Sequence, residues 1–131
     1  MRPWHAMRAA LAALAAFAGT AACAEWEMIA AGNNTMLFVD PMSIRGDGNL
    51  RRVSTMISYD ERQALGELSW VSLQEYDCRE ARLRTLAVTY YSERKAQGTV
   101  LKRFSVDTPG PWDDVPRNSA LADILKIVCG R

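Results

Sequence analysis

The chain has 131 residues, with 16 Lys and Arg, 15 Asp and Glu, and a single His. Its 49% hydrophobic and 24% charged residues are typical of a globular protein, which excludes disordered and collagen-like classes, and its length suits one domain with a removable end. The near-zero net charge gives no electrostatic reason to expect a nucleic-acid partner.

Residues 1–24 are typical of a secretory signal peptide. Arg2 and Arg8 form a short basic start, residues 9–18 are an unbroken apolar run, and Ala22-Cys23-Ala24 matches an A-x-A cleavage site. The apolar run is shorter than the roughly 17 residues that span a bilayer. We therefore expect a cleaved signal at 1–24 and a domain at 25–131, with no transmembrane segment after cleavage.

In a bacterium, export would place the domain in the periplasm, at the outer membrane or on the cell surface. A lipid anchor at Cys23 is the alternative to cleavage after Ala24. Thr20 stands where bacterial lipoprotein signals usually carry a large aliphatic residue, so we rank the anchor second.

Two cysteines, Cys78 and Cys129, remain after either processing route. An exported pair is expected to form a disulfide because the compartment is oxidising. Closing a loop of this length would stabilise the domain by about 4 kcal/mol. The alternatives are two buried, inert thiols or a redox couple, although the pair makes no C-x-x-C motif.

Short strand-like runs alternate with turn residues along the domain, which predicts a mostly antiparallel sheet. Gly32-Asn33-Asn34 is a turn between the first two runs, and Pro41 is expected to end the second because proline cannot donate to a strand ladder. Val53, Ile57, Leu86 and Val88 are expected in the core. The predicted strands are 26–31, 36–40, 50–59, 69–76, 83–91 and 99–106.

The last element is predicted to be a helix capped by Ser119. Leu121, Ile124, Leu125 and Val128 recur at helical spacing and form one apolar stripe, with Cys129 at its edge. A helix lying on the sheet by this stripe would direct the Cys129 thiol inward. The predicted fold is α+β, an antiparallel sheet of about six strands with a C-terminal helix packed on one face.

Several spaced motifs run through residues 25–131. They are Trp26, Phe38-Val39-Asp40 with Ser43-Ile44-Arg45 and a glycine turn, Glu75-Tyr76-Asp77-Cys78 followed by Arg79, Arg82 and Arg84, then Gly98, Trp112, Val115-Pro116, Ser119 and Val128-Cys129. On these residues the chain resembles the surface-adhesin protein E-like family of bacterial exported proteins. The loop Pro116-Arg117-Asn118-Ser119 departs from the compact Pro-Gly-Ser expected there.

The resemblance implies an exported, disulfide-linked α+β domain, whose named family member is a surface adhesin that binds host proteins. Implied partners are a host extracellular-matrix or serum protein, or an envelope protein. We therefore expect a small exported domain that acts by protein–protein binding. The alternative is a periplasmic structural or accessory protein with no host ligand.

Enzymatic chemistry is not expected. The single His, His5, lies in the predicted signal peptide, so the domain lacks the base of a Ser-His-Asp or Cys-His site and the ligand of common zinc sites. The carboxylate pairs Asp60-Glu61 and Asp113-Asp114 are expected in solvated loops. No glycine-rich phosphate-binding motif is present in the sequence, so we expect no cofactor and no metal.

Basic residues provide the best candidate for a binding surface. If they line one face of neighbouring strands, they could bind a polyanion such as heparan sulfate or an acidic host protein. The alternative is a solvated face balanced by Glu75, Asp77, Glu80 and Glu93. The residues of this predicted basic face are Arg79, Arg82, Arg84, Arg94, Lys95, Lys102 and Arg103.

Arg45-Gly46-Asp47 spells the tripeptide that integrins read in extracellular proteins. The same residues form a good β-turn with Gly48, and we interpret them as a turn.

Overall fold

The computed structural model of the protein describes residues 24–130. Cys23 and the rest of the predicted signal peptide up to it lie outside the described residues.

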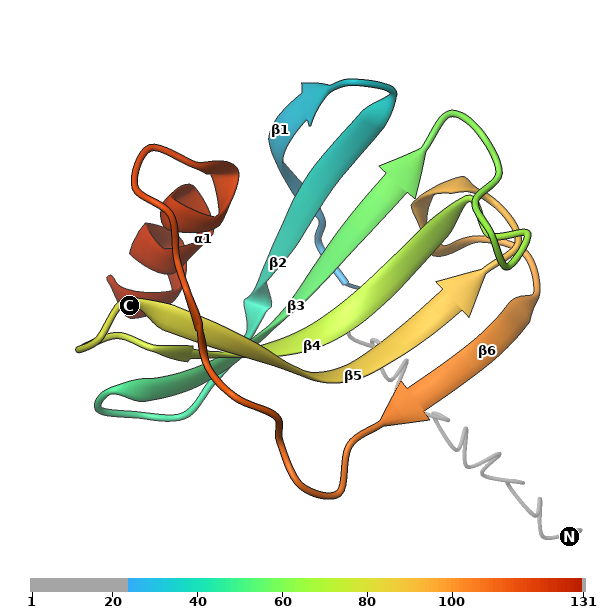
Figure 1. Ribbon diagram of the computed structural model, residues 1–131. Helices are drawn as coiled ribbons and strands as arrows, with labels where there is room; N and C mark the ends of the chain where they lie inside the picture. The colour runs from blue at the N-terminus through green and yellow to red at the C-terminus, as the bar shows by residue number, and fades with distance from the viewer. Residues whose placement is uncertain (1–23, 131) are drawn as a thin grey trace, which may run out of the picture.

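A seven-stranded antiparallel sheet forms the body of the domain (Figure 1). Its strands are β1 (Glu27–Gly32), β2 (Thr35–Arg45), β3 (Leu50–Tyr59), β4 (Ser69–Asp77), β5 (Arg82–Tyr91), β6 (Val100–Ser105) and β7 (Asp113–Asp114). β1 to β6 lie side by side in chain order, and the short β7 pairs with the start of β5. A 3₁₀ turn (Arg94–Ala96) precedes β6, and helix α1 (Ala120–Cys129) ends the described chain. The predicted α+β class is confirmed.

Short turns produce this sequential arrangement. Asn33 and Asn34 join β1 to β2 with φ of 51° and 61°, the left-handed conformation that asparagine tolerates. Two successive residues with positive φ match the twist of the flanking strands, so the chain folds straight back on itself.

Helix α1 lies on one face of the sheet, over its β1–β4 side (Figure 1). The Ser119 hydroxyl caps the helix by accepting a hydrogen bond from the Ala122 amide at 3.2 Å. Ile124 and Val128, from the predicted stripe, are fully buried. They pack in the main core with four residues of the sheet, which are Val39, Val53, Tyr76 and Leu83.

The predicted disulfide between Cys78 and Cys129 is present, with 5.7 Å between the two Cα atoms. It joins the last residue of α1 to the residue that follows β4. The C-terminal helix is therefore tied to the sheet both by its apolar stripe and by a covalent bond.

Three expectations about the strands are wrong. β2 does not end before Pro41 but continues to Arg45, because the pairing with β3 shifts between Asp40 and Arg45 and leaves Pro41 outside the regular ladder. Ile57 and Val88 are only half-buried, since they lie outside the main core beneath the helix. Asp113-Asp114, expected in a loop, forms β7.

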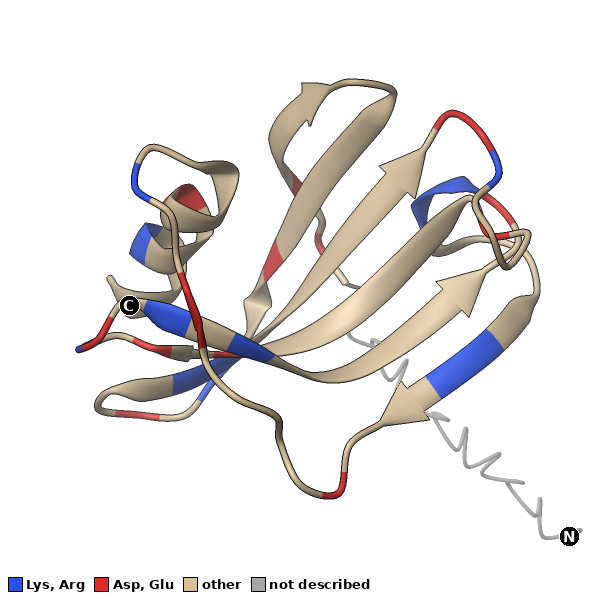
Figure 2. Cartoon of the chain, in the orientation of Figure 1, with Lys and Arg blue, Asp and Glu red and all other residues tan. Residues whose placement is uncertain are grey.

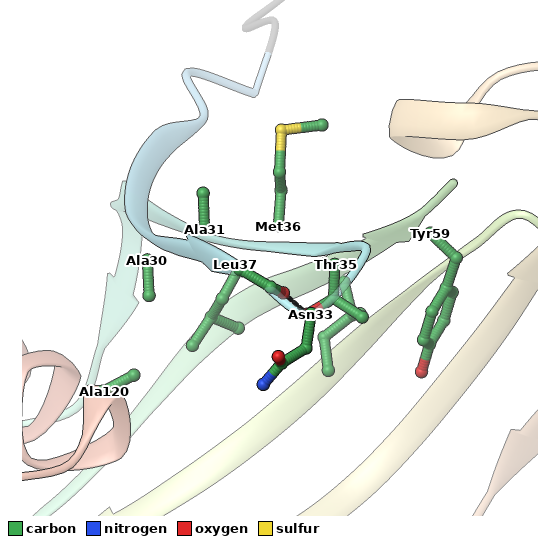
Figure 3. A pocket seen from close by; sticks show the side chains of 10 residues that line it. Ala30, Ala31, Asn33, Thr35, Met36, Leu37, Tyr59 and Ala120 are labelled. Atoms are coloured by element: carbon green, nitrogen blue, oxygen red, sulfur yellow. Dashed lines mark hydrogen bonds between the residues drawn. The ribbon is translucent and has the colours of Figure 1, made fainter. Parts of the chain in front are cut away.

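Ile57 instead lines an open pocket of about 350 Å³ between the β1–β2 hairpin and the start of α1. Figure 3 shows Leu37, Thr35 and Tyr59 around it, with Ala120 of the helix at one end. Its lining side chains are mostly small or apolar, and no charged side chain lines it. The pocket separates the helix from the uncovered part of the same sheet face.

Candidate binding surface

The structure divides the predicted basic face into three places (Figure 2). Arg79, Arg82 and Arg84 lie in the β4–β5 turn and at the start of β5, whereas Arg94 and Lys95 follow the far end of β5. Lys102 and Arg103 are neighbours in β6, so their side chains point to opposite faces of the sheet. The seven residues therefore do not share one face.

Arg94 and Lys95 hold their own turn against the sheet. The Arg94 guanidinium donates to the carbonyl oxygens of Tyr59 and Asp60 at 3.0 and 2.5 Å. The Lys95 amide donates to the Ser58 hydroxyl at 3.2 Å. The Arg94 side chain and the Lys95 backbone therefore connect this turn to the sheet.

Arg52, Glu75 and Arg84 face one another on β3, β4 and β5, on the side of the sheet opposite the helix. Glu75 is 6% exposed and bridges the two arginines. Its Oε2 accepts from Arg52 Nε at 3.1 Å, and its Oε1 accepts from Arg84 Nε and Nη2 at 3.0 and 2.6 Å. The carboxylate thus orients Arg84 by two charge-assisted hydrogen bonds.

Asp77 orients the next arginine in the same way. Its Oδ2 accepts from Arg82 Nε at 3.0 Å, and its Oδ1 accepts from the backbone amides of Arg79 and Glu80 at 3.1 and 3.2 Å. Asp77 therefore fixes both the β4–β5 turn and the Arg82 side chain.

These contacts keep both carboxylates ionised. Burial raises the pKa of Glu75, but the hydrogen bonds from Arg84 and Arg52 and their charges outweigh it, so the pKa lies below its usual value. Burial likewise raises the pKa of Asp77, and the bonds from the Glu80 amide, Arg82 and the Arg79 amide bring it below the ordinary range. The arginine positions therefore persist through the neutral pH range.

Trp112 lies against the two oriented guanidinium groups. Arg84 Cζ is 4.1 Å from the centroid of the indole ring and Arg82 Cζ is 5.0 Å from it, which are cation–π distances. Pairing of β7 with the start of β5 places Trp112 here, because Asp113 lies opposite Leu83 and Asp114 opposite Arg82. The half-buried indole is thus held by the sheet and by two cations.

An open hollow of about 440 Å³ adjoins this indole. Arg79 and Glu80 contribute to its lining from the β4–β5 turn, and Asn49 and Leu50 from the start of β3. We call Trp112, Arg79, Arg82 and Arg84, with Leu50 beside them, the Trp112 surface.

The charges of the Trp112 surface are largely compensated. Arg82 pairs with Asp77 and Arg84 with Glu75, as the balanced alternative from the sequence anticipates. Of the three arginines of the Trp112 surface, only Arg79 has a guanidinium that makes neither a hydrogen bond nor an ion pair within residues 24–130. The arrangement suits a protein contact through stacked aromatic and guanidinium groups better than a polyanion.

A sequence model described as Surface-adhesin protein E matches residues 26–130. The chain belongs to the surface-adhesin protein E family. A comparison with curated protein sequences finds no match.

Solved structures of Haemophilus influenzae protein E share the fold of this family member. One is 15% identical, with a TM-score of 0.61 over 80% of this chain and 83% of that chain. Another, from a non-typeable strain, is 16% identical, with a TM-score of 0.58 over 79% of this chain and 75% of that chain. Identities this low show a common fold and do not transfer binding residues.

Aromatic residues form a second feature of this surface-adhesin protein E domain, on the uncovered part of the face that carries α1. Phe104 is exposed, and Tyr59, Trp70 and Tyr90 are half-buried. The Trp70 indole N–H donates to the Tyr59 hydroxyl at 2.9 Å. The Tyr90 and Phe104 rings meet edge to face, with centroids 5.9 Å apart, and Lys102 Nζ lies 4.5 Å from the Phe104 centroid. This aromatic face extends from β3 to the edge strand β6.

Sequence reasoning missed the stacking of Arg82 and Arg84 on Trp112. The signal is not contained in one segment, because Trp112 meets Arg84 only through the pairing of β7 with β5.

The Arg45-Gly46-Asp47 tripeptide of this chain lies at the end of β2 and in the connection to β3. Arg45 Nη1 donates to the carbonyl oxygens of Met42 and Ile44, each at 2.8 Å, so the guanidinium is turned onto its own strand. A Cβ at Gly46 would come within 2.6 Å of the Leu50 carbonyl oxygen, so the turn requires glycine there.

The described part of the domain, residues 24–130, contains no group of three or more His, Cys, Asp or Glu side chains placed to hold a metal ion. None of its helices is long and apolar enough to cross a membrane.

Proposed function

We propose that the protein is an exported, non-enzymatic adhesin-type domain that acts by binding another protein at the bacterial envelope. Membership of the surface-adhesin protein E family over residues 26–130 supports this class of function. The signal peptide predicted at residues 1–24 supports export.

The Trp112 surface is the proposed contact site. The observation that carries this choice is the half-buried indole of Trp112 with the guanidinium groups of Arg82 and Arg84 stacked on it. A few residues carry most of the binding energy of a protein interface, and tryptophan, tyrosine and arginine are enriched among them.

The surface is also preorganised for binding. Arg82 and Arg84 are already fixed by Asp77 and Glu75, so little side-chain freedom remains to be lost when a partner binds. Leu50, which is 45% exposed, provides apolar area beside the indole. The proposed partner is a host extracellular-matrix or serum protein, which requires display on the cell surface.

Exposure to added protease on intact cells tests the display. Digestion of the tagged protein in intact cells supports surface display. Digestion only after the outer membrane is permeabilised would favour the alternative, a periplasmic accessory protein with no host ligand.

Binding of purified protein to immobilised extracellular-matrix and serum proteins tests the contact site. Trp112→Ala should weaken binding by about tenfold or more, as expected for an interface hot spot. Met42→Ala is the matched control, because Met42 is 66% exposed on β2, which β3 and β4 separate from β5. Equal binding by the two variants would place the contact elsewhere.

A further inference from the structure

Strand β6 forms an open edge of the sheet. It pairs with β5 on one side, and its other side meets no strand among the described residues. All six residues of β6 are exposed. A strand with a free edge presents a row of backbone donors and acceptors to any extended segment of suitable shape.

The register identifies which groups face outward. The Val106 amide donates to the Leu86 carbonyl oxygen at 3.0 Å, so the backbone N–H of Val106 faces β5. Because backbone direction alternates along a strand, Arg103 and Ser105 direct their N–H and C=O groups to the free edge.

The charge along this edge has one sign. The charged residues of β6 (Val100–Ser105) are Lys102 and Arg103, and the strand contains no Asp or Glu. Lys102 and Arg103 are neighbours in β6, so their side chains place positive charge on both faces of the strand. An incoming strand with acidic residues opposite them would form favourable charge pairs on both faces of the sheet.

An apolar position lies between the charges and the end of β6. Phe104 is 45% exposed, although Tyr90 holds its ring edge to face. An apolar side chain opposite Phe104 would extend the aromatic face by one strand. It would also cover area that water now contacts.

We propose that β6 binds an extended segment of another protein by strand addition, with acidic residues opposite Lys102 and Arg103 and an apolar residue opposite Phe104. Strand addition is a recurring mode of peptide recognition, in which backbone hydrogen bonds supply affinity and side-chain pairs supply specificity. The inference goes beyond the proposed function, since Trp112 lies on the opposite face of the sheet.

A second copy of the chain fits this edge poorly. Two antiparallel β6 strands centred on Lys102 or on Arg103 place like charges directly opposite one another, which is destabilising. Lysine on an edge strand is a common means by which proteins prevent such self-pairing. The charges therefore select an acidic segment.

The test is an NMR titration of the ¹⁵N-labelled domain with a capped peptide of central sequence Thr-Thr-Val-Glu-Glu-Val. In antiparallel pairing its valine before the glutamates lies opposite Phe104, and the glutamates lie opposite Arg103 and Lys102. The amides of Arg103 and Ser105 should shift. A peptide with lysines in place of both glutamates should bind about tenfold more weakly, since cross-strand charge pairs turn from attractive to repulsive.

Ser105→Pro and Ser105→Ala form a matched pair, because they carry the same charge and differ in the outward N–H. Proline is tolerated where a strand N–H faces solvent, so β5–β6 pairing should persist while peptide binding is lost. Ser105→Ala should bind as wild type does. If the proline variant does not fold, the double variant Lys102→Glu/Arg103→Glu decides the question by reversing the preference between the two peptides.

Three results would overturn the proposal. They are no shift with the glutamate peptide, equal affinity for both peptides, and unchanged preference in the charge-reversed variant. Shifts at Arg103 and Ser105 that depend on protein concentration without peptide would assign the edge to a second copy.

Discussion

Removing the Cys78–Cys129 disulfide should destabilise the domain by about 2–4 kcal/mol. The two cysteines are 51 positions apart, and chain-entropy reasoning gives about 4 kcal/mol for a loop of that length. The lower end of the range allows for residual structure in the reduced, unfolded chain. Helix α1 should remain docked in part, because Ile124 and Val128 stay buried and Arg51 Nη1 still donates to the Val128 carbonyl oxygen at 3.1 Å.

The assay is urea denaturation followed by circular dichroism, with the double variant Cys78→Ser/Cys129→Ser compared with oxidised wild type. Reduced wild type is the control, since it loses the bond and keeps the sulfur atoms. Both should unfold at a lower urea concentration than the oxidised protein. Coincident transitions for all three would refute the reasoning, because they would mean that the bond does not constrain the unfolded chain.

Three further substitutions test the core, a turn and the paired carboxylate. Ile124→Ala should destabilise by about 2–5 kcal/mol, measured by urea denaturation, because Ile124 is fully buried between helix and sheet. Gly46→Ala should lower the thermal midpoint more than Gly48→Ala, since a Cβ at Gly46 meets the Leu50 carbonyl oxygen whereas one at Gly48 meets open space. Because the pKa of Glu75 is lower in the folded than in the unfolded protein, its ionised form stabilises the fold. This stabilisation is complete above the unfolded pKa of about 4.3 and is lost as pH falls through the folded pKa. Glu75→Gln should therefore reduce the loss of stability between about pH 5 and pH 3, measured by urea titrations.

A different result would contradict each of these three predictions. An unchanged midpoint for Ile124→Ala would mean that the helix is not docked by its stripe. Equal effects of the two glycine substitutions would mean that Gly46 is not confined by Leu50. A pH profile unaffected by Glu75→Gln would mean that its ion pairs do not contribute to stability.

Local sequence patterns predicted the elements that depend on a single segment. The helical spacing of Ile124 and Val128 with the Ser119 cap predicted α1, and the asparagines after Gly32 predicted the first hairpin. The disulfide could be predicted because export and cysteine number left one pairing.

Features that depend on pairing between strands could not be predicted in this way. The course of β2 through Pro41 depends on a register shift against β3, and β7 is too short to have a periodicity. Separation of Lys102 from Arg103 follows from strand alternation, but the bridge of Glu75 to Arg52 and Arg84 requires the register of three strands. The sequence therefore identified arginines of the candidate site but did not predict how they are arranged.

The most direct test of the central claim is photocrosslinking on intact cells incubated with extracellular-matrix and serum proteins. A photoreactive amino acid replaces Leu50, beside the Trp112 indole, or Met42, on the distant β2 strand. Our account predicts a crosslinked partner from position 50, its loss in the Trp112→Ala background, and no crosslink from position 42. Crosslinking at position 50 that persists without the indole, or that occurs equally at position 42, would contradict it.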